Sequence, residues 1–161
     1  MTIKMKIKGL MIDPMTQMPI IVLKDPEGDA VLPIWVGLFE ANAIALQIEQ
    51  VATPRPMTHD LLKNLIGEFE AKVEKIVVND LKENTFYAQI HLQRGGGILR
   101  IDARPSDAIA LALRAGAPIF VEEKVVSRAK KVDMTKDASE SDRWRQWLEK
   151  LDPEDFGKYE M

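Results

Sequence analysis

Apolar and polar residues alternate with a period of two at the start of the chain. Between residues 3 and 8, each apolar residue is followed by a lysine. This is the pattern of a strand with one buried face and one face of lysines. Apolar runs bounded by turn residues indicate two more strands, at 19–23 and 30–36. The first segment of the chain is therefore predicted to form three strands.

The period then changes to that of a helix. Apolar side chains recur every three or four residues between 38 and 51, which predicts an amphipathic helix there. A Pro-Arg-Pro break follows, and Thr58 is positioned to cap a second helix that runs to about residue 69. The remaining elements are predicted as strands near 73–81, 85–94 and 98–103, a helix from Pro105 to about Gly116, and a short strand at 118–121.

Two parts of the chain resemble each other at an offset of 65 residues. Asn-Ala-Ile-Ala-Leu at 42–46 matches Asp-Ala-Ile-Ala-Leu at 107–111, and three predicted strands precede each of these helices. We therefore predict an α+β fold of duplicated three-strand-plus-helix units. These units would form a mostly antiparallel or mixed sheet with helices packed on one face, followed by a C-terminal helical tail.

We predict a domain at 1–126 and an acidic, partly helical tail at 127–161. The segment 127–138 is polar and is expected to be loose, whereas Ser139 is positioned to cap a last helix that reaches about Leu151. Residues 1–133 contain 17 basic and 17 acidic residues, and residues 134–161 contain 5 and 8. A neutral body predicts only weak, salt-sensitive binding of nucleic acid.

Composition excludes several kinds of chemistry. The chain has no cysteine and 2 histidines, which excludes disulfides, thiol nucleophiles, iron–sulfur clusters, cysteine-ligated zinc and a three-histidine site within one chain. A metal would be held mainly by carboxylates, which favours Mg, Mn or Ca. No apolar stretch is long enough to span a membrane, and the charged N-terminus does not fit a signal peptide. We expect a cytoplasmic protein without a membrane partner.

Two predicted helix starts share a pattern of residue types. Residues 55–60 and 104–107 each place Arg-Pro before a hydroxyl residue and an aspartate. Helix capping alone explains this pattern, because hydroxyl groups and first-turn acids stabilise any helix N-terminus. The same groups also suit phosphate binding, since a helix N-terminus and a nearby arginine both favour an anion. The candidate phosphate-binding residues are Arg55, Arg104, Thr58 and Ser106.

Carboxylates and a histidine near these helix starts are the candidates for catalysis. Asp102 and Asp107 flank one helix start, and we expect them to share a small volume with Arg104; pairing of Asp102 with arginines on a solvated sheet face explains the same residues. His59 is the best general acid or base, whereas His91 is expected to be structural. The candidate catalytic residues are His59, Asp60, Asp102 and Asp107, and the candidate metal ligands are Asp102, Asp107 and Glu40.

Several motifs together resemble the bifunctional nuclease domain family. They are Leu-Pro-Ile-Trp-Val-Gly at 32–37, Glu-Ala at 40–41, Pro-Arg-Pro-Met-Thr-His-Asp-Leu-Leu at 54–62, Thr-Phe-Tyr-Ala at 85–88 and Asp-Ala-Arg-Pro-Ser-Asp-Ala-Ile-Ala at 102–110. The likeness covers about residues 3–126. It implies an α+β domain that self-associates, as a homodimer or a higher homo-oligomer, and an activity on both DNA and RNA.

Three hypotheses about function follow. The first is a metal-assisted nuclease that uses Mg or Mn to hydrolyse phosphodiester bonds in DNA and RNA with little sequence preference. The second is a non-catalytic oligomeric module that binds an anionic ligand or a protein partner. A third is a small-molecule hydrolase that uses the same acids on a nucleotide. In the second case, the Arg-Pro motifs at the helix starts serve only as caps.

Overall fold

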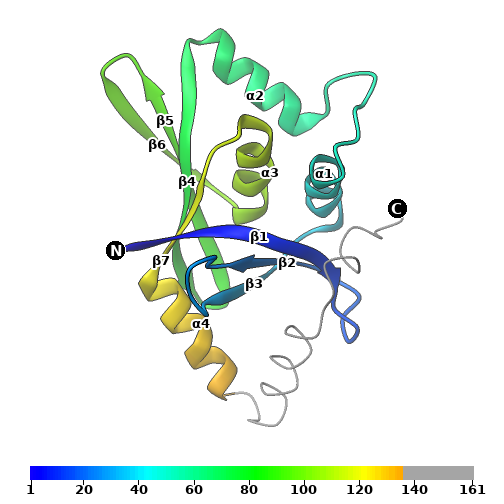
Figure 1. Ribbon diagram of the computed structural model, residues 1–161, viewed down its shortest axis with the longest axis vertical. Coiled ribbons are helices and arrows are strands. Elements are labelled where there is room, and N and C mark those ends of the chain that lie inside the picture. The colour runs from blue at the N-terminus through cyan, green and yellow to red at the C-terminus, as the bar shows by residue number, and fades with distance from the viewer. Residues whose placement is uncertain (136–161) are drawn as a thin grey trace.

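The computed structural model describes residues 1–135 as a seven-stranded sheet with four helices (Figure 1). Every strand and helix predicted up to residue 122 is present, with small shifts at the ends. Within the described residues, no helix is both long and apolar enough to cross a membrane. In chain order the elements are β1 (Thr2–Ile12), β2 (Pro19–Lys24), β3 (Val31–Trp35), α1 (Leu38–Ile48), α2 (Thr58–Glu68), β4 (Ala71–Lys82), β5 (Thr85–Arg94), β6 (Gly97–Ala103), α3 (Pro105–Ala115), β7 (Ile119–Glu122) and α4 (Glu123–Thr135).

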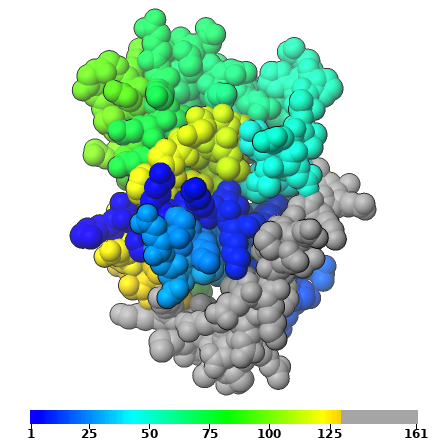
Figure 2. Space-filling model, viewed as in Figure 1, coloured from blue at the N-terminus to red at the C-terminus, as the bar shows by residue number. Residues whose placement is uncertain are grey.

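The sheet confirms the predicted duplication. Its strand order is β3-β2-β1-β7-β4-β5-β6, and every neighbouring pair is antiparallel except β4 with β7. Each unit is therefore a three-stranded antiparallel meander followed by a helix, α1 in the first unit and α3 in the second. Figure 2 shows the first strand, in blue, crossing below the green residues of the second unit. Strand β7 lies between the two meanders and joins them into one sheet.

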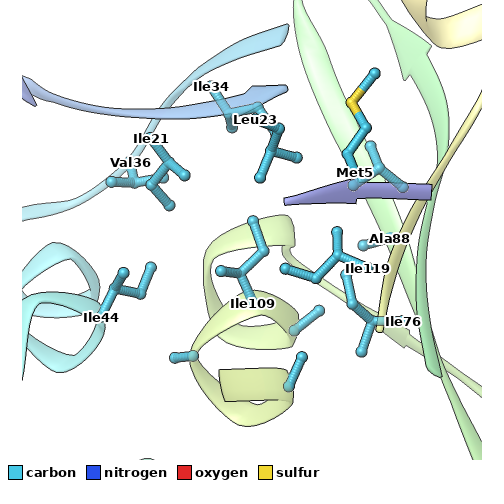
Figure 3. Close-up of a cluster of buried hydrophobic side chains, with 14 of the residues drawn as sticks. Met5, Ile21, Leu23, Ile34, Val36, Ile44, Ile76, Ala88, Ile109 and Ile119 are labelled. Carbon is cyan, nitrogen blue, oxygen red and sulfur yellow. The ribbon is translucent and has the colours of Figure 1, made fainter. Parts of the chain in front are cut away.

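The core lies between this sheet and the paired helices α1 and α3. Ile44 of α1 and Ile109 of α3 are fully buried. Figure 3 shows them among side chains from both meanders, including Ile21 and Ile76. Helix α3 begins with Pro105 and ends before a left-handed glycine, as its sequence predicts. The two halves therefore share one hydrophobic core.

Helix α4 occupies a segment that we expected to be loose from residue 127 onwards, so that expectation is wrong through residue 135. Val125 and Val126 are buried, and Arg128 donates to the Asp80 carboxylate on β4 at 2.6 Å. Charged residues surround these contacts in the sequence, so the composition of the segment does not indicate that it packs against the domain. The predicted domain boundary at 126 falls within α4, and the helix predicted at 139–151 lies outside the described residues.

Helix α2 is held to the domain mainly by polar contacts of its first turn. His59 is its only buried residue, and the partly buried Ile66 contacts the core. Three large apolar side chains of α2, and one directly after it, are at least 37% exposed, namely Leu61, Leu62, Leu65 and then Phe69. Apolar burial alone therefore does not position this helix.

One buried guanidinium links the three helices α1, α2 and α3. Arg114, near the end of α3, donates from Nε to Asp60 of α2 at 2.7 Å. It also donates from Nη1 to the Ala110 carbonyl of α3 and from Nη2 to the Ala43 carbonyl of α1, each at 2.9 Å. Only 4% of the Arg114 side chain is exposed. A buried cation is stable only when its donors are satisfied, and these three contacts use all three nitrogens.

Asp60 has two roles in this arrangement. Its Oδ2 accepts the backbone N–H of Met57 at 2.9 Å, which caps α2, and its Oδ1 accepts from Arg114. The Met57 N–H lowers the pKa of Asp60 most, and Arg114 lowers it further, against the opposing effect of burial. The ionised form of Asp60 therefore stabilises the folded chain.

Replacing Arg114 with methionine is expected to lower the free energy of unfolding by about 3 kcal/mol, because Asp60 and the Ala43 carbonyl lose a buried partner. Urea unfolding at neutral pH measures this change. Arg128→Met is the control: it removes a more exposed ion pair with Asp80 and should lower the free energy of unfolding much less than Arg114→Met does. Equal losses in the two variants would contradict the central role of Arg114.

Asp60→Asn is expected to flatten the loss of stability at acid pH. The folded pKa lies below the ordinary value of 3.8, so the contribution is present above that pH and is lost as pH falls towards the folded pKa. Urea unfolding from about pH 6 to pH 2.5 should show a steeper decline in the wild type than in the variant. Asp29→Asn, at an exposed aspartate, is the control. If stability declined as little with falling pH in this control as in Asp60→Asn, the role assigned to Asp60 would be refuted.

Candidate functional site

The first turns of α1, α2 and α3 meet, and their side chains form one hydrogen-bonded cluster. Its members are Glu40 of α1, His59 of α2, and Arg104 and Asp107 at the start of α3. The contacts join residues 48 and 64 positions apart in the chain. Three helix N-termini concentrate partial positive charge at this place, which favours anionic groups.

His59 and Asp107 form the core of the cluster. His59 Nε2 lies 2.9 Å from Asp107 Oδ1. Because an ionised carboxylate only accepts, Nε2 carries the proton and Nδ1 is left as the acceptor nitrogen. The His59 side chain is mostly buried. Its Nδ1 atom makes no hydrogen bond to a described residue. Nδ1 is therefore the ring nitrogen that remains able to accept a proton.

Arg104 joins the two carboxylates and remains open to solvent. Its Nε donates to Asp107 Oδ2 at 2.9 Å, and its Nη2 lies 2.7 Å from Glu40 Oε1 and 2.8 Å from Asp107 Oδ2. The hydrogen bond that Arg104 donates to Asp107, and then the one that it donates to Glu40, raise the pKa of Arg104, so it is always a cation. Its side chain is 65% exposed, and Nη1 is not used in these contacts. Two N–H groups of Arg104 are thus available to an incoming anion.

Glu40 reaches this position because glycine precedes α1. The Glu40 carboxylate folds back so closely over Gly37 that a Cβ at residue 37 would overlap it. Gly37 adopts an extended conformation and makes no side-chain cap. The Leu-Pro-Ile-Trp-Val-Gly motif thus ends in the residue that lets Glu40 approach Arg104.

The two hydroxyl residues do not cap their helices as predicted. The N-cap residues are Met57 and Arg104, and neither helix has a side-chain hydroxyl cap. Thr58 and Ser106 lie one and two residues inside, and Ser106 is buried. At α2 the capping acceptor is the carboxylate of Asp60 instead. Capping by hydroxyl groups therefore does not explain the shared pattern, whereas capping by an acid explains it at α2.

The structure does not bring Asp102 to the cluster. Strand pairing places Asp102 opposite Gln89, whereas its neighbour Ala103 lies opposite the fully buried Ala88. Successive side chains of a strand point to opposite faces, so Asp102 lies on the face away from the core and α3. Asp102 and Asp107 therefore do not share the small volume that we expected. The prediction was wrong because a separation of five residues in the sequence does not show which face of the strand Asp102 occupies.

The remaining acids do not form a ready metal site. Within residues 1–135, no three Asp, Glu or His side chains are grouped so as to hold a metal ion. Both oxygens of Asp107 are engaged, by His59 and Arg104, and the Arg104 guanidinium bridges Glu40 to Asp107. Because this donor set does not fit Mg or Mn as it stands, no step below is routed through a metal.

Arg55 lies apart from the hydrogen-bonded cluster. It is exposed and lines a separate hollow of about 330 Å³ with Asp60 and Arg114. Arg114 itself was not among the residues that the sequence suggested. The signal was present, since Arg114 is the lone charged residue in the run from Ala108 to Ala115. A charge within such a buried helix indicates a satisfied ion pair.

Comparisons with known proteins show which family this chain is similar to. The model of the bifunctional nuclease domain matches residues 21–134. An uncharacterized protein of Mycobacterium tuberculosis is 35% identical over 95% of this chain and 97% of its own length.

Plant relatives match over a smaller share of their length. Bifunctional nuclease 1 of Arabidopsis thaliana is 29% identical over 65% of this chain and 34% of the plant protein. Bifunctional nuclease 1 of Oryza sativa is 27% identical over 65% of this chain and 33% of the plant protein. The matched family segment includes every residue of the cluster, and the chain belongs to the bifunctional nuclease domain family.

Proposed function

We propose that this chain hydrolyses phosphodiester bonds of DNA and RNA at the cluster of Glu40, His59, Arg104 and Asp107. The observation that carries the proposal is the His59–Asp107 pair at 2.9 Å beside an arginine that is 65% exposed. A base, its orienting acid and an anion-binding cation are the groups that phosphodiester hydrolysis requires. Membership of the family and the names of the plant relatives support the same reaction class.

Each residue has a distinct role in the proposed reaction. Arg104 Nη1 binds a non-bridging phosphate oxygen, and the converging helix N-termini add to this attraction. His59 Nδ1 removes a proton from the attacking water as the water oxygen bonds to phosphorus. The bond between phosphorus and the leaving oxygen breaks, the leaving oxygen takes up a proton from solvent water, and His59 then returns its extra proton to solvent. Asp107 keeps the His59 proton on Nε2 and stabilises the imidazolium, as in other acid–histidine pairs. Water as the nucleophile makes no use of the ribose 2′-hydroxyl, which is consistent with action on both DNA and RNA.

One observation favours the rival hypothesis of a non-catalytic module. Arg104 is already bound by two carboxylates, so the cluster also serves to fasten α1, α2 and α3 together. Under the hypothesis of a non-catalytic module, His59 Nδ1 takes part in no reaction. A requirement for Mg or Mn and a cytoplasmic location stay predictions, and the assay below includes the metal test.

The test is cleavage of labelled single-stranded DNA, duplex DNA and RNA with Mg, with Mn and with EDTA. His59→Gln and Asp107→Asn should each lose at least about 100-fold in rate. The controls are His91→Gln, at the other histidine, and Asp80→Asn, at the ion pair with Arg128, which is outside the hydrogen-bonded cluster. Both controls should retain the wild-type rate, and circular dichroism and thermal unfolding should confirm that all four variants fold.

Three outcomes would contradict parts of the proposal. Equal cleavage by the wild type and both cluster variants would exclude this site. No cleavage of any substrate would favour the rival module. Full activity in EDTA would refute the expected metal requirement and leave the roles of His59 and Arg104 in place.

A further inference from the structure

Strand β6 is an edge strand with an unusual amount of exposed apolar surface. All six residues from Gly97 to Asp102 are exposed. Ile98, Leu99 and Ile101 are 39%, 49% and 44% exposed. Strand β6 pairs with β5 without a register shift and contains no proline. Protein edges of this kind usually carry a bulge, a proline or inward charges that block further pairing, and β6 has none of the three.

The two faces of β6 differ in character. Strand pairing places Leu99 opposite Leu92 and Ile101 opposite Ile90, both on the core side of the sheet. Helix α3 packs on β4 and β5 and leaves this part of β6 uncovered. Arg100 and Asp102 lie on the opposite face. Neither forms a hydrogen bond or an ion pair with another described residue.

We propose that β6 is the contact between two copies of this chain, paired antiparallel about a two-fold axis that passes between the two Ile101 residues, perpendicular to the sheet. In this register Arg100 lies opposite Asp102 of the second copy, and Asp102 lies opposite its Arg100. On the other face, Ile101 meets its own counterpart and Leu99 meets Ala103. The pairing therefore closes the apolar face and satisfies both charges at once.

Charge selects this register over its neighbours. Residues directly opposite each other in an antiparallel pair lie on the same face of the sheet. Each alternative register therefore places the two-fold axis at another residue of β6. An axis at Arg100 places the two guanidinium groups opposite each other, and an axis at Leu99 places Arg100 opposite Ile98. Of these three positions, only the axis at Ile101 pairs opposite charges. This self-complementarity favours a second copy over a different protein as the occupant of the edge.

The pairing has a consequence for the cluster at α3. An axis perpendicular to the sheet keeps the helical layers of both copies on the same side. Arg104 contacts Glu40 of α1 and Asp107 of α3, so the Arg104 side chains of both copies lie on that side. The proposed dimer does not depend on the proposed nuclease activity, because it rests on β6 alone.

The first experiment is covalent capture, which detects even a weak pair. The chain has no cysteine, so Ile101→Cys provides its only thiol. At the axis the two Cα atoms would lie about 5 Å apart, within the range for a disulfide. Mild oxidation should give a disulfide-linked dimer. Leu99→Cys is the matched control on the same face, where the two Cα atoms would be about 14 Å apart and linkage should be at least tenfold slower. Faster linkage at position 99 than at position 101 would overturn the register.

The second experiment exchanges the charges. Arg100→Asp and Asp102→Arg should each raise the dimer dissociation constant at least about tenfold, measured by sedimentation, because each places like charges opposite each other. The double variant restores both pairs and should return to within about threefold of the wild type. Arg94→Asp, on β5, is the control. Single variants without effect or a double variant without rescue would overturn the proposal. So would a wild type that stays monomeric together with an Ile101→Cys variant that forms no linked dimer.

Discussion

The buried guanidinium of Arg114 is the contact on which the helical layer depends. It binds a side chain of α2 and carbonyls of α1 and α3, and α2 has little apolar burial of its own. The same helix carries His59 to Asp107. Stability and site geometry are therefore coupled, because a weaker Arg114–Asp60 pair also loosens the histidine that faces the candidate phosphate site.

The duplicated architecture explains why the cluster forms where it does. Each meander ends in a helix, and these two helices pack against each other over a shared core. Glu40 comes from the first unit and Asp107 from the second, and α2 adds His59 between them. The cluster thus belongs to the junction of the units, and neither unit could form it alone. Arg104 offsets the repulsion between the two carboxylates.

Sequence patterns predicted the elements better than the contacts between them. Period-two alternation and apolar runs bounded by turn residues identified the strands, and the repeat of 42–46 at 107–111 identified the two units. Helix α4 was missed because its buried residues Val125 and Val126 stand in a segment of mostly polar residues. Asp102 was misplaced because nearness in sequence says nothing about which face of a strand a residue occupies. The Arg114 contacts with Asp60 and Ala43 span 54 and 71 residues, and only the fold brings such distant groups together.

The neutral charge balance of the domain is compatible with phosphate chemistry. A guanidinium has five N–H donors, and the contacts of Arg104 with Glu40 and Asp107 use only Nε and Nη2. In the proposed reaction, phosphate would bind Nη1 without displacing either acid, and the acids would hold the guanidinium in a fixed orientation. Preorganisation of this kind lowers the entropy lost on binding. Local geometry rather than net charge would then set the affinity, in keeping with weak, salt-sensitive binding by a body that carries no excess of cations.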